Sequence, residues 1–266
     1  MRPVLFHVAG FPVYAYSVFI VVAYLAALAY ALGEARRQRL NPTLMVDFSM
    51  VMFIAGIVGA RLLFVLIDYR IFLDRPLEAL KLWNGGFIFY GGLIAATLAA
   101  VIFMKRRGLA VGFWSDLLAP SAMISLAAGR IGCFLNGCCY GRIAPDLPWG
   151  VVYPPSHPAL GLAQYPVHPA QLYESLAALL IFLFLVALIP RKTFPGEIFW
   201  LMVLLYAAAR FGLEFLRGDP RGNLPIFGLS TSQAIAAATF IVAGGFLLHL
   251  RRRARRQARL EPGAPA

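Results

Sequence analysis

Long runs of apolar residues, separated by short clusters of charged residues, extend along most of the chain. A helix that crosses the hydrocarbon core of a bilayer needs roughly 20 consecutive, mainly apolar residues. Seven runs have about that length, at residues 13–32, 44–67, 87–104, 113–135, 171–189, 197–216 and 231–250. The pattern therefore predicts an all-α membrane protein with seven transmembrane helices.

Basic residues gather directly after several of these runs. Short loops on the cytoplasmic side of a membrane collect Lys and Arg, so such clusters indicate the orientation of the chain. Seven spans with the amino terminus outside and the carboxyl terminus in the cytoplasm place every cluster on the cytoplasmic side, whereas an even number of spans does not. The clusters lie at residues 36–39, 105–107, 191–192 and 251–259.

The composition supports the same class, because 61% of the 266 residues are hydrophobic and only 14% are charged. A formal net charge of +12 would indicate nucleic-acid binding if the basic residues formed one face, but they follow the apolar runs, and no nucleic-acid partner is expected. We interpret residues 1–250 as one polytopic membrane domain and residues 251–266 as a basic cytoplasmic tail. This tail could also contact anionic head groups.

The segment at residues 136–170 is long for a connection between two membrane helices. It contains seven prolines, which deny it a continuous helix. Loops of this length are usually functional, so we expect a small cap on the outer face of the helices.

Ionisable residues interrupt the apolar runs, where each charge costs about 2.5–3.5 kcal/mol on insertion scales. One interpretation is local pairing, since Arg210 and Glu214 are spaced to meet on one helix face. That pairing leaves further arginines unexplained, and an excess of arginine over carboxylate favours an anionic ligand such as phosphate. The interrupting residues are Arg61, Asp116, Arg130, Glu174, Arg210, Glu214 and Arg217.

Glycine pairs at 85–86 and 91–92 flank the entry to the third run. Glycine at a helix entry lets the backbone approach a ligand, and free N–H groups there can meet an anion. Small residues in membrane helices also allow close packing, which is the simpler interpretation for Gly56, Gly59 and Ala60.

Four sequence blocks occur in a fixed order along the chain. They read GGFIFYGGLI at 85–94, GRIGCFLNGCCYGR at 129–142, HPAQLYE at 168–174 and RFGLEFLR at 210–217. With Gly59-Ala60-Arg61 and a tyrosine in the first run, these blocks cover the chain from about residue 13 to 220. The set resembles the bacterial prolipoprotein diacylglyceryl transferases.

This resemblance implies an enzyme of the bacterial inner (plasma) membrane with no cofactor. Members transfer the diacylglyceryl group of phosphatidylglycerol to the lipobox cysteine of a preprolipoprotein signal peptide, which forms a thioether and releases glycerol phosphate. Two alternatives stay open. One is a divergent paralogue with another thiol acceptor or phospholipid, and the other is a non-catalytic lipid-binding membrane protein.

The resemblance also implies roles for individual residues. Arg130 and Arg210 would hold the phosphate, Glu214 would orient Arg210, and Tyr90 occupies the position of a candidate proton acceptor. Substrate-binding positions would be Tyr16, Arg61, Gly91, Gly92, Asn136, Gly141, His168, Glu174 and Arg217.

The chain departs from the family at three positions, 90, 133 and 138. Family members commonly carry His at position 90, and because tyrosine is a poor base at neutral pH the proton acceptor stays open. They commonly carry Asn and Glu where this chain has Cys133 and Cys138. The spacing of these cysteines and Cys139 matches no standard zinc pattern, so no metal is expected, and a disulfide involving Cys138 or Cys139 is an alternative.

Overall fold

The computed structural model describes residues 3–8, 10–73, 75–82, 85–154, 165–218 and 228–260. The chain divides into two compact units. The first contains Met1–Tyr30 and Ser115–Ala266, and the second contains Ala31–Trp114.

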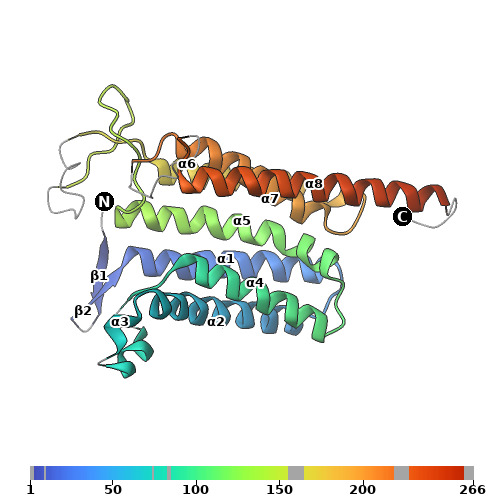
Figure 1. Cartoon of the computed structure of the whole chain (residues 1–266), viewed down its shortest axis with the longest axis horizontal. Coiled ribbons are helices and arrows are strands. Elements are labelled where there is room, and N and C mark those ends of the chain that lie inside the picture. The colour runs from blue at the N-terminus through green and yellow to red at the C-terminus, as the bar shows by residue number, and fades with distance from the viewer. Residues whose placement is uncertain are drawn as a thin grey trace. The chain divides into compact units, whose positions relative to one another are not determined.

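The first unit consists mainly of long helices (Figure 1). Its elements are strands β1 (Val4–Val8) and β2 (Phe11–Tyr14), most of α1 (Ala15–Arg37), most of α5 (Val111–Asn136), α6 (Ala170–Leu188), the short 3-10 helix η4 (Ile189–Arg191), α7 (Glu197–Glu214) and α8 (Thr231–Leu260). In the second unit, the remaining part of α1 leads to α2 (Pro42–Ile67), α3 (Tyr69–Phe72), the 3-10 helix η1 (Pro76–Leu80) and α4 (Phe89–Arg106).

Six helices are long and apolar enough to cross a membrane, namely α1, α2, α4, α5, α6 together with η4, and α8. This finding confirms the prediction of a multi-span membrane protein. The sixth predicted run, at residues 197–216, does form a helix, α7, but its 18 residues include Glu197, Arg210 and Glu214, and it is not among the six. Seven spans and the orientation of the termini therefore stay predictions.

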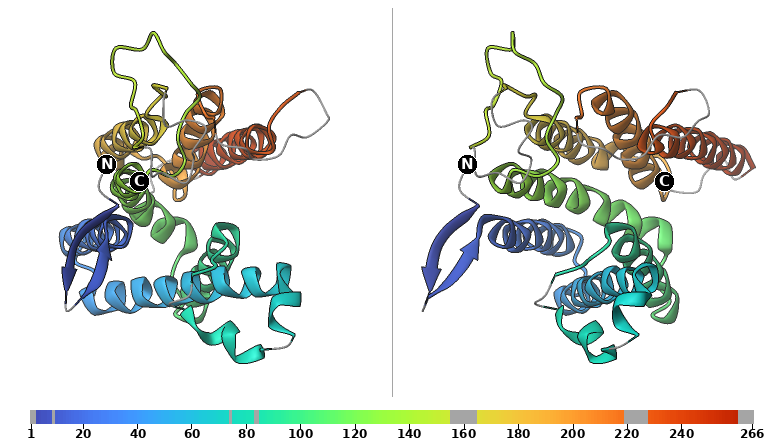
Figure 2. Two further views of the ribbon diagram at one scale, coloured as in Figure 1. Left: turned by 90° about the vertical axis from the view of Figure 1, so that its left-hand side faces the viewer. Right: turned by 60° about the vertical axis from the view of Figure 1, so that its left-hand side comes forward.

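The all-α prediction did not include the amino-terminal hairpin. Strands β1 and β2 pair antiparallel, and Gly10 in the connection has a φ of +84°. Figure 2 shows the hairpin leading directly into α1. Because β2 extends through Tyr14, the helix begins at Ala15, two residues later than predicted.

The core of the first unit lies between α5, α6 and α7. Ala119 and Met123 of α5 pack against apolar residues of the other two helices, among them Leu185 and Ile198. Outward-facing residues of α6 such as Leu180 and Phe184 are about half exposed, at 57% and 50%. A rim of exposed apolar side chains around a small core fits helices that face lipid.

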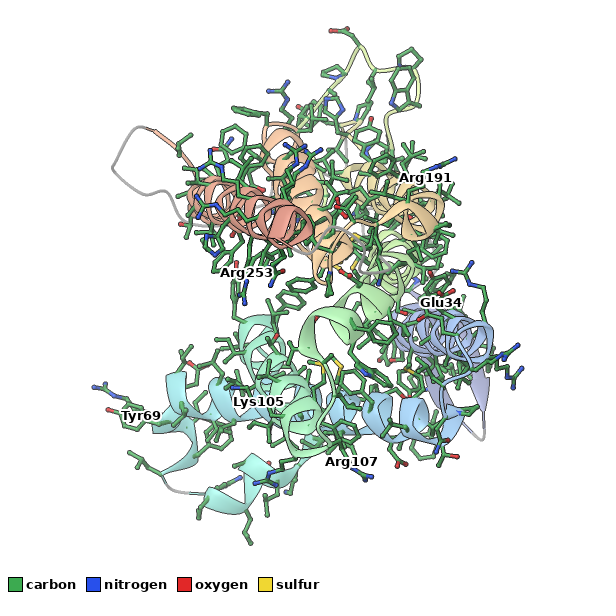
Figure 3. The ribbon with its side chains drawn as sticks, turned by 90° about the vertical axis from the view of Figure 1, so that its right-hand side faces the viewer. Glu34, Tyr69, Lys105, Arg107, Arg191 and Arg253 are labelled. Carbon is green, nitrogen blue, oxygen red and sulfur yellow. The ribbon has the colours of Figure 1, made fainter. Side chains whose placement is uncertain are left out.

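Several side chains of the predicted basic clusters lie toward the ends of helices. Figure 3 shows Lys105 and Arg107 at the end of α4, Arg191 in η4 and Arg253 on the last turns of α8. Helix α8 continues ten residues past the predicted run, to Leu260, so the first part of the basic tail is helical. Residues 261–266 of that tail lie outside the described residues.

Helices α2 and α4 pack closely in the second unit because glycines face each other. A Cβ atom added at Gly91 would lie 2.4 Å from the carbonyl oxygen of Gly59, and one added at Gly92 would lie 2.8 Å from that of Gly56. Gly91 and Gly92 thus take part in the packing that the sequence suggested for Gly56 and Gly59.

Gly91→Ala is expected to lower the free energy of unfolding by about 1–3 kcal/mol, because the new methyl group meets the backbone of Gly59, which cannot move aside. Gly33→Ala is the matched control, because, apart from the chain neighbours and nearby backbone of the same helix, no atom of the described residues lies within 4 Å of a Cβ atom at Gly33. Thermal unfolding in detergent micelles compares the two. Equal melting temperatures would contradict the role of Gly91 in helix packing.

Candidate active site

One buried carboxylate joins three helices of the first unit. Glu174, near the start of α6, is 1% exposed. Its Oε1 atom accepts hydrogen bonds from Arg130 Nη2 of α5 at 2.8 Å and from the Tyr206 hydroxyl of α7 at 2.7 Å. Its Oε2 atom lies 3.4 Å from Arg217 Nη1, just beyond the end of α7. The structure thus brings together Arg130, Glu174 and Arg217, three of the predicted site residues.

A second carboxylate, Glu214, pairs with Arg210 on α7. Arg210 Nη2 lies 2.6 Å from Glu214 Oε2, which is an ion pair by distance although the atoms are not aligned for a hydrogen bond. The local pairing that the spacing predicted is therefore confirmed. Glu214 Oε1 also accepts a hydrogen bond from the Ser230 hydroxyl at 2.9 Å. Ser230 and Gln233 form a capping box at the start of α8, which fixes this contact.

The two groups of charges lie near each other. Tyr206 bonds to Glu174 and is within electrostatic reach of both Arg130 and Arg210. Residues 206, 210, 214 and 217 follow one face of α7 and its extension, and this spacing could have identified Tyr206 from the sequence. Tyr206 was not predicted as a site residue, because a neutral tyrosine does not interrupt an apolar run in the way that a charged residue does.

Positive charge exceeds negative charge at this site. Arg130, Arg210 and Arg217 face two carboxylates. In addition, Arg130 Nε and Arg210 Nη1 are buried without a hydrogen-bond partner among the described residues. Buried polar groups in folded proteins nearly always have partners, so unpaired donors beside excess positive charge indicate a place for an anion.

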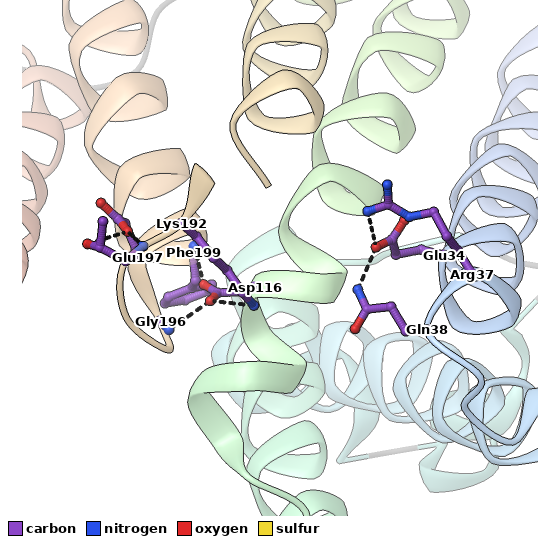
Figure 4. A network of polar contacts seen from close by, with 9 residues as sticks. Glu34, Arg37, Gln38, Asp116, Lys192, Gly196, Glu197 and Phe199 are labelled. Carbon is purple, nitrogen blue, oxygen red and sulfur yellow. Dashed lines mark hydrogen bonds and ion pairs between the residues drawn. The ribbon is translucent and has the colours of Figure 1, made fainter. Parts of the chain in front are cut away.

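Asp116 fixes the relative height of α5 and α7, far from this cluster. Its carboxylate accepts hydrogen bonds from the backbone N–H groups of Gly196 and Phe199, at 2.8 and 3.0 Å, and lies 3.4 Å from Lys192 Nζ (Figure 4). Arg130 lies 14 residues beyond Asp116, and Arg210 lies 14 residues beyond Gly196. Equal helical distances of about 21 Å therefore bring the two arginines to the same level.

Tyr16 approaches the site from α1. A Cβ atom added at Gly132 of α5 would lie 2.6 Å from Phe19 Cβ and 3.6 Å from Tyr16 Cα, so this glycine lets α1 pack closely against α5. Tyr16 is within electrostatic reach of Arg130 and of the thiols of Cys133, Cys138 and Cys139.

These three cysteines gather at the carboxyl end of α5. Their sulfur atoms all lie within 4.8 Å of one another, and none of the three forms a disulfide bond. Hydrogen bonding to the Cys133 and Cys138 thiols, together with the nearby Arg217 guanidinium, lowers the pKa of Cys139. Asn136 lies at the same helix end, where its side chain contacts the Cys138 thiol.

The segment after α5 contacts both the entry to α6 and the residues that follow α7. Gly141 forms a β-bridge with Arg217, and its N–H donates to the carbonyl of His168 at 3.0 Å. A Cβ atom at Gly141 would lie 2.5 Å from that same oxygen, so only glycine fits where these segments cross. Residues 155–164 of the predicted cap lie outside the described residues.

His168 lies at the entry to α6 and contacts Tyr173, whose hydroxyl is 3.3 Å from His168 Nδ1. That hydroxyl also accepts a hydrogen bond from Trp149 Nε1 at 2.7 Å. These contacts link the cap segment to α6. Partial burial and the charge of Arg142 lower the pKa of His168 below its ordinary value of 6.5.

Because the folded protein holds His168 with a depressed pKa, the unfolded chain binds a proton more readily, and stability falls as the pH drops below about 6.5. We expect His168 to titrate below 6.5 in an NMR experiment on histidine-labelled protein, with His168→Gln for assignment. Arg142→Gln should move the midpoint upward, whereas Arg70→Gln should not. A midpoint unaffected by Arg142→Gln would contradict the proposed influence of that charge.

The second unit contains Arg61, Tyr90, Gly91 and Gly92. Arg61 is buried and donates all five of its N–H groups to backbone carbonyls, including those of Ala79 and Gly85. No donor of Arg61 is left for a phosphate. Tyr90, in the first turn of α4, is 50% exposed. A cavity of about 400 Å³ in this unit is lined by none of the predicted site residues but by Val51, Ala99, Ile102, Phe103, Arg106 and Arg107.

Comparison with known proteins identifies the family. Residues 3–249 match the family model described as prolipoprotein diacylglyceryl transferase. The chain belongs to this family. The match includes the α5–α7 cluster and residues of both units. The resemblance to this family that the four sequence blocks indicated is therefore confirmed over nearly the whole chain.

Individual relatives agree with the family match. Proteins named phosphatidylglycerol–prolipoprotein diacylglyceryl transferase are similar to this chain over most of its length. The protein of Clostridium tetani is 35% identical, over 95% of this chain and 98% of the relative. That of Rhodospirillum rubrum is 34% identical, over 95% and 93%, and that of Geobacter sulfurreducens 31%, over 90% and 92%.

Proposed function

We propose that this transferase moves the diacylglyceryl group of phosphatidylglycerol to the lipobox cysteine thiol of a preprolipoprotein, forming a thioether. The observation that carries the proposal is the surplus of guanidinium groups at the junction of α5, α6 and α7. Arg130 and Arg210 each keep a buried donor that no described residue accepts. A phosphodiester offers the anionic oxygens that such donors require.

The reaction needs a thiolate, a carbon centre and a leaving group. The acceptor thiol loses its proton, and the sulfur attacks the carbon of the diacylglyceryl group that is bonded to a phosphate oxygen. The bond between that carbon and the ester oxygen breaks, and its electron pair departs with glycerol phosphate. Arg130 and Arg210 would stabilise the negative charge that develops on the departing phosphate, since fixed donors act strongly in a site that excludes water.

The other residues would position these arginines. Glu214 would hold Arg210, and Glu174 would hold Arg130 and Arg217, at the distances that the structure shows. Tyr16 and Asn136 would line the lipid site beside them. Gly141 and His168 would act through the cap segment, and Arg61, Gly91 and Gly92 through the packing of the second unit.

Tyr90 is proposed as a proton acceptor, with the departing phosphate as the alternative. Tyr90→Phe separates the two, because it removes the hydroxyl and keeps the ring. Loss of turnover would favour Tyr90, and unchanged turnover would favour the phosphate.

We further propose seven membrane spans in the bacterial inner membrane, with the amino terminus outside and α7 as the sixth span. Three charged residues distinguish α7 from the six more apolar helices. Glu197 lies at the start of the helix, and Arg210 and Glu214 form an ion pair that partly neutralises their charges, so α7 can still cross the membrane. A phosphatase fused after residue 150 should be active outside the cytoplasm. A fluorescent protein fused at the carboxyl terminus should fold inside.

The activity is tested with purified protein in phosphatidylglycerol vesicles and a synthetic lipobox peptide. Mass spectrometry should show the peptide gaining a diacylglyceryl group while glycerol phosphate is released. A peptide with Ser for Cys and vesicles of phosphatidylethanolamine are the controls. If the folded protein modifies no lipobox peptide and does not complement a transferase-depleted bacterium, the proposed function is wrong and the paralogue alternative is favoured.

A further inference from the structure

The three cysteines of the chain form a cluster whose position is fixed by the backbone. Cys133 lies in the last turn of α5, which ends at Asn136, and Gly137 follows with a φ of +78°. The N–H of Cys138 then donates to the carbonyl of Cys133 at 3.2 Å. This reversal is the usual way in which a chain turns back at a helix end, and it places Cys138 and Cys139 over Cys133.

The spacing of the sulfur atoms fits a metal ion. In a tetrahedral zinc site with Zn–S bonds of about 2.3 Å, the sulfur atoms are roughly 3.8 Å apart. The three thiols already lie within 4.8 Å of one another, so small rotations of the side chains bring them to that separation. The sequence predicted no metal, because the spacing of the three cysteines differs from the standard zinc patterns, which have four ligands.

The surrounding charge also fits. Three thiolates around Zn²⁺ carry a net charge of −1. Arg217 lies against the Cys139 thiol, and Arg130 is within electrostatic reach of Cys133 and Cys139. Donor sets made only of thiolates select soft ions such as Zn²⁺.

We propose that Cys133, Cys138 and Cys139 bind one zinc ion and leave its fourth coordination position open for the acceptor thiol. Three protein ligands and one open position are the arrangement of reactive zinc sites, whereas structural sites are closed by four ligands. The cluster adjoins Arg130, Tyr16 and Arg217, the residues of the proposed transferase site.

The role of the open position rests on the proposed function. The acceptor thiol releases its proton to water when its sulfur binds zinc, because a coordinated thiol is deprotonated. The bound sulfur then forms the bond to the glyceryl carbon while the carbon–oxygen bond to the phosphate breaks. The resulting thioether is a neutral, weaker ligand and leaves the metal. This route supplies the thiolate without a strong base at position 90.

Metal binding is tested without reference to activity. Purified protein should contain about one zinc per chain by mass spectrometry, and Co²⁺ in its place should give sulfur-to-metal charge-transfer absorption. Cys138→Ser should lose the metal, and Cys138→His should retain it, since histidine is also a zinc ligand. Absence of bound metal after loading, or a Cys133–Cys138 disulfide that leaves one titratable thiol, would overturn the zinc site.

Activity then tests the open position. Chelation should lower the rate of thioether formation by about 100-fold or more, and Zn²⁺ should restore it, because a group that assists proton removal contributes at least that factor. If zinc binds but chelation leaves the rate unchanged, the role of the open position is wrong and the transferase function stands. If protein with bound zinc modifies no lipobox peptide, the proposed function fails while the metal site stands.

Discussion

Arg130→Ala is expected to lower the rate of thioether formation by about 100- to 1000-fold, the range seen when one donor that stabilises developing charge is removed. Arg130 reaches the site from α5, with Nη2 bonded to Glu174 and with Nε buried without a hydrogen-bond partner among the residues that the structure describes. The substitution removes both the charge and the free donor. Because Glu174 keeps its contacts with Tyr206 and Arg217, the cluster should still assemble.

Two further variants test whether the loss of activity is specific to the guanidinium group of Arg130. Arg130→Lys keeps the charge but lacks the planar fork of donors, so it should recover only part of the activity. Arg191→Ala is the control, because Arg191 is exposed in η4 and donates a hydrogen bond to the backbone carbonyl of Ala187 at the end of α6. The rate is measured by mass spectrometry of the lipobox peptide in phosphatidylglycerol vesicles. Full activity in both Arg130→Ala and Arg210→Ala would contradict the proposal that these arginines bind the phosphate.

Glu174→Ala is expected to destabilise the folded protein by about 3–5 kcal/mol, as the loss of one partner from a buried ion pair usually does. The carboxylate is 1% exposed and faces two guanidinium groups and a tyrosine hydroxyl. Its removal leaves Arg217, whose side chain is only 3% exposed, next to Arg130 without an intervening negative charge. We therefore expect both lower thermal stability and loss of activity.

The matched substitution Glu174→Gln separates charge from shape. Glutamine still accepts the hydrogen bond from Tyr206 and fills the same space, so its loss of stability should be smaller. Asp47→Ala removes an exposed acidic residue of α2 and should leave the melting temperature unchanged. Thermal unfolding in detergent compares the four proteins. A Glu174→Ala variant as stable as the parent protein would show that the two arginines do not depend on this carboxylate.

The site residues differ in how far the sequence predicted their contacts. The Arg210–Glu214 pair followed from a spacing of four residues, because helix geometry fixes which side chains meet over one turn. Arg61 was predicted as a substrate-binding residue, but its donors bond to the backbone carbonyls of Glu78, Ala79, Lys81, Gly85 and Gly86. Sequence order cannot show that a loop folds back over a charged side chain.

The sequence by itself determined the membrane class, the helices and the family. Apolar runs and positive clusters reflect the thickness and polarity of the bilayer, which act on local segments and need no tertiary structure to be read. Only the tertiary structure decided which charges share a carboxylate. Arg130 meets Glu174 across 44 residues of sequence, Tyr206 joins them from a third helix, and three cysteines of unusual spacing gather at one helix end. Such contacts depend on how helices pack and where a backbone reverses.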